Sequence, residues 1–82
     1  MTAEISIRHG VQRKAGGAFF GVIHVDARPG YPLTVRLGVD DGEERQYTLE
    51  PGDTFPVHDE TWVLDRVDDP SGNWRVVIRK AE

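Results

Sequence analysis

The sequence contains no cysteine and no long hydrophobic run. Without cysteine no disulfide can stabilise the domain, and small domains that fold without one are typical of a reducing compartment. The first residues lack the basic start and the apolar stretch of a signal peptide. No apolar run approaches the roughly 18 residues that a membrane-spanning helix needs. We therefore expect a cytoplasmic protein with no membrane partner.

Motifs for catalysis and for cofactor binding are also absent. Ser6 and Ser71 are the only serines, and neither sits in the strand-to-helix turn of a nucleophilic serine. The glycines form no phosphate-binding loop ahead of a helix. The acidic stretch 40–44 lacks the alternating ligand positions of a calcium loop. The sequence therefore predicts a protein that is not an enzyme, with no catalytic residue, no cofactor and no metal.

Length and charge limit the domain organisation and the partners. A chain of 82 residues is long enough for one hydrophobic core, so we expect a single domain over residues 1–82. The net charge of −4 argues against nucleic acid, whose phosphates are bound through Lys and Arg. Eleven acids and two bases lie between Asp40 and Asp69, whereas the remainder holds three acids and eight bases. Such asymmetry favours a charged partner or self-association.

Alternating apolar and polar residues predict a fold made of strands. Leu33, Val35, Leu37 and Val39 alternate with polar or small residues, and Asp41-Gly42 then suits a tight hairpin. Gly and Pro interrupt the chain so often that at most one short helix fits. We expect an all-β fold, a small antiparallel barrel or sandwich of six to seven strands.

Three further segments carry specific predictions. The first strand, from Ile5 to Val11, should hold His9 on its apolar face. Pro51-Gly52 should form a type II turn, and the strand that follows it contains Pro56 and should lie at an edge. Thr61 to Val67 fits a strand with a bulge near Asp65, and a helix starting at Asp59 is the alternative.

The segment from Ala18 to Asp26 is apolar on both faces. Such a strand lies in the middle of a closed core, or another chain covers its outer side. Homodimerisation through this strand or through an edge strand is therefore one expectation.

Three kinds of binding site are compatible with the residues. The first is a protein-interaction surface anchored by large aromatic side chains, for which the candidates are Phe19, Phe20, Tyr31 and Trp74. The second is a small-ligand or carbohydrate site at a barrel mouth, formed by His24, Asp26, His58 and Asp59. The third, single-stranded nucleic acid, needs a basic strip beside Phe19 and Trp74, made of Arg8, Arg13, Lys14, Arg75, Arg79 and Lys80. The first hypothesis leads, because the acidic middle of the chain would repel a polyanion.

Several short motifs resemble a known family. They are Asp40-Asp41-Gly42-Glu43-Glu44-Arg45, Gly52-Asp53-Thr54-Phe55, Thr61-Trp62, Leu64-Asp65-Arg66-Val67, Pro70-Ser71-Gly72 and Trp74. In these the chain is similar to a family of short uncharacterised actinobacterial β proteins, a domain of unknown function. The ratio of eight Arg to two Lys suits a GC-rich genome. The resemblance covers most of the chain and implies no activity.

Overall fold

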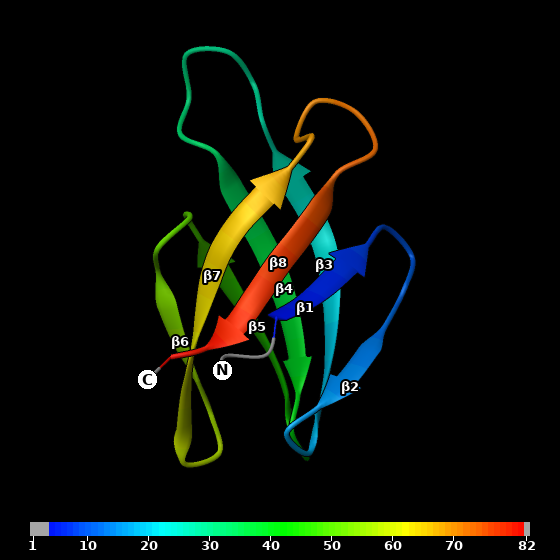
Figure 1. Ribbon diagram of the computed structural model, residues 1–82, viewed down its shortest axis with the longest axis vertical. Coiled ribbons are helices and arrows are strands. Elements are labelled where there is room, and N and C mark those ends of the chain that lie inside the picture. Colours follow the sequence, from blue (N-terminus) through cyan, green and yellow to red (C-terminus); the bar gives the residue numbers. More distant parts are fainter. Residues whose placement is uncertain (1–3, 82) are drawn as a thin grey trace.

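The computed structural model describes residues 4–81, which form two packed antiparallel sheets (Figure 1). The β1 sheet has the strand order β1 (Glu4–Arg8), β8 (Arg75–Lys80), β7 (Glu60–Asp68) and β6 (Thr54–Val57). The β3 sheet has the order β2 (Arg13–Ala15), β3 (Ala18–Asp26), β4 (Thr34–Asp40) and β5 (Glu44–Leu49). Residues 4–81 contain no helix, and so none that could cross a membrane.

The all-β prediction is confirmed, and of the two predicted architectures the fold is a sandwich. The described chain has eight strands, one more than the upper expectation. The difference arises at β2, whose sequence Arg13-Lys14-Ala15 has no apolar alternation to reveal it. Pairing with β3 makes this segment a strand.

The core lies between the two sheets and is built from every second residue of the paired strands. Val35, Leu37 and Val39 of β4 are buried, as their alternation predicts. Phe20 of the β3 sheet packs against two rings of the β1 sheet: its centroid lies 6.4 Å from that of Phe55 and 5.2 Å from that of Trp62. Offset and edge-on aromatic contacts at these separations add to the gain from burial.

Turns form where glycine was expected to permit them. Gly42, in the loop between β4 and β5, has φ 112°, and Gly52, after Pro51, has φ 95°. In the second turn the amide of Asp53 donates to the carbonyl of Glu50 at 2.9 Å. β6, which contains Pro56, is an edge strand as predicted.

β7 is a strand with a bulge, so the helix alternative is wrong. Its pairing with β8 shifts register between Leu64 and Arg66, which leaves Asp65 as the extra residue. Before the shift Leu64 faces the core opposite Ile78, and after it Arg66 faces outward opposite Val77. The bulge thus reconciles the two apolar patterns of this segment.

The prediction that His9 lies on the apolar face of the first strand is wrong. β1 ends at Arg8, and Gly10 with φ 77° turns the chain, so only Ile7 of the expected set is fully buried. His9 is exposed and packs edge-on against Trp74, with ring centroids 5.7 Å apart.

β3 lies in the interior of its sheet, between β2 and β4. Ala18 and Phe20 face the core, whereas Phe19 and Ile23 face outward. No strand of the described chain covers this outer face, which only the β1–β2 loop borders.

Candidate functional site

A groove of about 390 Å³ crosses the outer face of the β3 sheet. Its floor is formed where Gly21 of β3 pairs directly with Gly38 of β4. Neither residue has a side chain, so the sheet surface is hollow at this point. A glycine within a strand often marks such a place, where another group can approach the backbone closely.

Apolar side chains form the walls of the groove. Phe19, Ile23 and Val11 are 43%, 50% and 44% exposed, and all three line it. Ile23 lies at the β3 bulge between Val22 and His24, and its side chain leans over Gly38, with Cδ1 3.5 Å from the position that a Cβ would take. Val11 comes from the loop between β1 and β2.

Most of the exposed large hydrophobic side chains gather at this groove. Four large hydrophobic side chains are exposed among residues 4–81, and three of them surround this one hollow. Scattered apolar side chains are normal on a protein surface, whereas apolar side chains gathered in one place make a candidate binding surface.

Opposite charges flank the groove. Asp40 and Glu44, a register pair at the β4–β5 turn, form an acidic rim, and neither makes an ion pair with another residue of the described chain. Asp40 accepts a hydrogen bond from the amide of Gly42 at 3.1 Å. The Lys14 ammonium lies 5.5 Å from the centre of the Phe19 ring. Apolar walls with a carboxylate rim suit a side chain that has an apolar stem and a positive head.

The four aromatic candidates lie in four separate environments. Phe19 belongs to the groove. Phe20 is fully buried in the core, so it cannot contact a partner, because adjacent residues of a strand point to opposite faces. Tyr31 lies in the β3–β4 loop, 60% exposed, with the Arg28 guanidinium 4.2 Å from its ring centre. Trp74 is half-buried against His9.

The four residues of the alternative ligand site do not converge. His24 and Asp26 lie on the second half of β3. His58 lies near the other end of that strand, because its Nε2 is 3.5 Å from the carbonyl oxygen of Gly17, just before β3 begins. Asp59 lies beside His58 in the β6–β7 turn, at the opposite end of β3 from Asp26 (Figure 1). A site that needs all four side chains is therefore not formed. Within the described residues no group of three or more His, Asp or Glu side chains could hold a metal ion.

Asp26 has a local partner instead. Nε of Arg28 donates to its carboxylate at 2.9 Å, and Nη2 does so at the same distance. These hydrogen bonds from Arg28 hold the pKa of Asp26 below its ordinary value.

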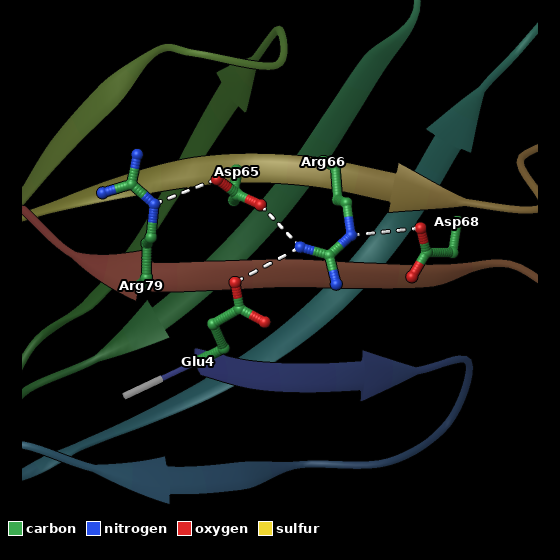
Figure 2. A network of polar contacts seen from close by, with 5 residues as sticks. All are labelled: Glu4, Asp65, Arg66, Asp68 and Arg79. Carbon is green, nitrogen blue, oxygen red and sulfur yellow. Dashed lines mark hydrogen bonds and ion pairs between the residues drawn. The ribbon is translucent and has the colours of Figure 1, made fainter. Parts of the chain in front are cut away.

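A network of polar side chains covers the outer face of the other sheet (Figure 2). Arg66 donates to Asp65 at 2.7 Å, to Asp68 at 3.2 Å and to Glu4 at 3.3 Å. Arg79 donates to Asp65 at 2.9 Å. The hydrogen bonds from Arg79 and then Arg66 lower the pKa of Asp65.

This network has a structural role. Val77 is the register partner of Arg66, and it is only 1% exposed although its neighbours Val76 and Ile78 are the residues that face the core. The Arg66 side chain and its partners therefore shield Val77 from water, as long charged side chains often do with their apolar stems.

Sequence reasoning missed most of the groove. Gly21, Gly38, Ile23 and Val11 were not among the candidate residues, although the two glycines carried a signal. Each stands inside an otherwise clear strand pattern, where glycine is unfavourable unless the backbone must be approached or bent. Their direct pairing across β3 and β4 depends on the register, which the sequence does not display.

Comparison with known proteins identifies the family of this chain but no activity. A family model matches residues 2–82, nearly the whole chain. No curated protein and no solved structure matches the chain. The match confirms the resemblance to a domain of unknown function, and it assigns no activity. The chain belongs to the family of unknown function DUF6406.

Proposed function

We propose that this protein is a cytoplasmic, non-enzymatic interaction domain that binds a segment of a partner protein in the groove on the β3 sheet. The observation that carries the proposal is the arrangement of three exposed apolar side chains, Phe19, Ile23 and Val11, around the Gly21–Gly38 floor. Binding energy at protein interfaces is concentrated in a few large side chains that fill such hollows. The arginine-rich composition supports an actinobacterial source.

The occupant we propose is a short segment in which an apolar side chain stands next to Lys or Arg. The apolar side chain would rest on the glycine floor against Phe19, and the cation would face Asp40 and Glu44. The groove volume of about 390 Å³ is near the lower end of the usual range for ligand pockets, which suits one or two side chains rather than a large interface.

A peptide selection tests this proposal. A random peptide library displayed on phage is panned against the immobilised domain, and we expect enrichment of sequences that combine Lys or Arg with a neighbouring Leu, Phe or Trp. The affinity of one enriched peptide is then measured by fluorescence anisotropy. Phe19→Ala should weaken it about tenfold or more, since truncating an aromatic hot spot costs about 2 kcal/mol or more and about 1.4 kcal/mol already corresponds to a factor of ten.

Tyr31→Ala is the matched control, because Tyr31 is an exposed aromatic outside the groove. It should leave the affinity unchanged. A library that enriches no basic-apolar motif, or an equal loss of affinity in the two variants, would overturn the proposal.

A second copy of this chain is the competing occupant of the groove. Static light scattering of the wild type and of Phe19→Ala separates the two. A monomer at high concentration supports a foreign segment. A dimer that Phe19→Ala dissociates would show instead that the groove mediates self-association.

A further inference from the structure

Three arginines without carboxylate partners meet where β1, β2 and β8 come together. The chain has eight arginines, and four of them form ion pairs, namely Arg28, Arg45, Arg66 and Arg79. The other four make no ion pair with any residue from 4 to 81. Three of those four, Arg8, Arg13 and Arg75, line a single depression of about 280 Å³. We call these three residues the arginine cluster.

The pairing of the strands brings the cluster together. Arg8 and Arg75 are direct register partners in the β1–β8 pair. Like charges at directly opposed positions of a sheet are destabilising. Arg13 comes from β2 in the other sheet, and it points to the same side of its sheet as its register partner Phe20, toward the β1 sheet.

Within the part of the chain that the structure describes, no acidic side chain lines this depression, whose other residues are Ser6 and Val11. On its other side Arg75 has an acid, Asp68 of β7, as its direct register partner, but this carboxylate accepts a hydrogen bond from Nε of Arg66 at 3.2 Å and forms no ion pair with Arg75. Residues 4–81 thus keep three cations together without a counter-ion, although the net charge of the chain is −4 and other arginines are paired. An anion from outside the chain would relieve this repulsion.

We propose that the arginine cluster binds the phosphate or diphosphate group of a small molecule. A guanidinium group presents its N–H donors in a planar fork that matches the oxygens of a phosphate, and three such groups match a multiply charged anion. The hydroxyl of Ser6 in the same depression provides a further donor.

The basic strip expected from the sequence is not continuous in the fold. The strip expected from the sequence also included Arg79 and Lys80, but these are bound to Asp65 and Glu60 respectively. Lys14, another member, lies against Phe19 at the groove. Of the six residues of that strip, only the three of the arginine cluster therefore meet in one depression, whereas single-strand binding needs a groove that follows a backbone over several nucleotides.

A second depression lies beside the first and indicates what the organic part could be. Arg8 and Arg75 line it together with His9, Asn73 and Trp74. The rings of His9 and Trp74 meet edge-on at 70°. A planar group attached to the phosphate would reach these aromatic side chains while the phosphate stays on the arginines.

Calorimetric titration of the full chain at low ionic strength with inorganic pyrophosphate and with ADP tests the proposal. We expect one molecule bound per chain, with an affinity that falls as salt is added. Equal affinity for the two ligands assigns the site to a bare diphosphate, and tighter binding of ADP extends it to the Trp74 depression. Arg13→Gln and Arg75→Gln should each weaken binding about tenfold or more, because hydrogen bonds between charged groups are the strong ones.

Arg36→Gln is the matched control, since Arg36 is also outside any ion pair of the described chain but does not line the depression. It should leave pyrophosphate binding unchanged. Phe19→Ala should also leave it unchanged, which separates this site from the groove and lets either proposal fail alone.

A melting curve without ligand distinguishes binding from a structural role. Arg75→Gln should melt at the same temperature as the wild type or higher, because it removes the repulsion with Arg8, while Asp68, the other register partner of Arg75, stays bonded to Arg66. The proposal is overturned if millimolar pyrophosphate and ADP give neither heat nor a rise in melting temperature, if Arg36→Gln weakens binding as much as Arg13→Gln, or if Arg75→Gln destabilises the domain. Binding of a single-stranded oligonucleotide far tighter than of pyrophosphate would replace the small molecule by nucleic acid.

Discussion

Adding one methyl group to the floor of the groove should stabilise the domain and impair its binding. Gly38 does not have the positive φ that favours glycine, so Gly38→Ala fits the backbone without strain. A Cβ at this position would lie 3.5 Å from Cδ1 of Ile23 and 3.6 Å from the carbonyl oxygen of Gly21. Both are ordinary van der Waals contacts, and neither neighbour has to move.

The expected gain in stability comes from the unfolded state. Replacing glycine by alanine at a compatible position reduces the conformational freedom of the unfolded chain and stabilises by about 0.4–1 kcal/mol. A change of 1 kcal/mol moves the melting temperature of a domain of this size by about 4–8 °C, so the expected rise is about 2–8 °C. The same methyl group occupies the space where a partner side chain would rest, and the affinity for a selected peptide should fall about tenfold.

Thermal unfolding followed by circular dichroism measures the first effect, and fluorescence anisotropy with the selected peptide measures the second. Gly52→Ala is the control, because Gly52 lies outside the groove and has φ 95°. It should lower the melting temperature and leave peptide affinity unchanged. A lower melting temperature in Gly38→Ala would refute the claim that the groove floor has room, and an unchanged affinity would refute the claim that the groove binds.

Two further predictions concern the network on the β1 sheet and the core. The folded pKa of Asp65 is lowered from its ordinary value of 3.8, so its contribution to stability is present above that value and is lost as the pH falls through the lowered pKa. Asp65→Asn should therefore lower the melting temperature at neutral pH, and its melting temperature should fall less than that of the wild type when the pH is lowered. Asp59→Asn, in an exposed turn, should have neither effect. Identical profiles of melting temperature against pH in the two variants would contradict this. Nε1 of Trp62 is buried with no hydrogen-bond partner among the described residues, and such a donor costs about 1–3 kcal/mol. Trp62→Phe removes that donor, which offsets the lost ring contacts. In urea denaturation, Trp62→Phe should therefore change the free energy of unfolding by no more than about 1 kcal/mol, whereas Trp62→Ala should lower it by about 3–5 kcal/mol. An equal loss of stability in the two variants would refute this explanation.

Local patterns account for most of the predictable part of the fold. The alternation from Val35 to Val39 reports which side of β4 is buried, because side chains of a strand point alternately to its two faces. Gly42 and Gly52 report turns, because each adopts a positive φ that other residues avoid. The bulge at Asp65 is also predictable from the local pattern, because one extra residue is the simplest way to join two alternations that are out of phase.

The candidate sites were less predictable because they depend on contacts between distant segments. Phe19 and Phe20 are identical side chains in adjacent positions, and nothing local says which one enters the core. The groove needs Gly21 opposite Gly38, and the arginine cluster needs Arg8 opposite Arg75, with Arg13 supplied by the other sheet. Register and sheet packing decide both arrangements.

The amino-acid sequence by itself determined that this chain forms strands, where most of them turn, and that it carries an acidic middle between basic ends. Only the tertiary structure decided which apolar side chains stay in water and which arginines find a carboxylate. Arg66 forms ion pairs with Glu4, Asp65 and Asp68, whereas Arg75, which lies between Arg8 and Asp68 in its sheet, forms none with any residue from 4 to 81. The reason is physical: strand propensity acts over a few neighbouring residues, whereas burial and ion pairing are set by which strands lie side by side.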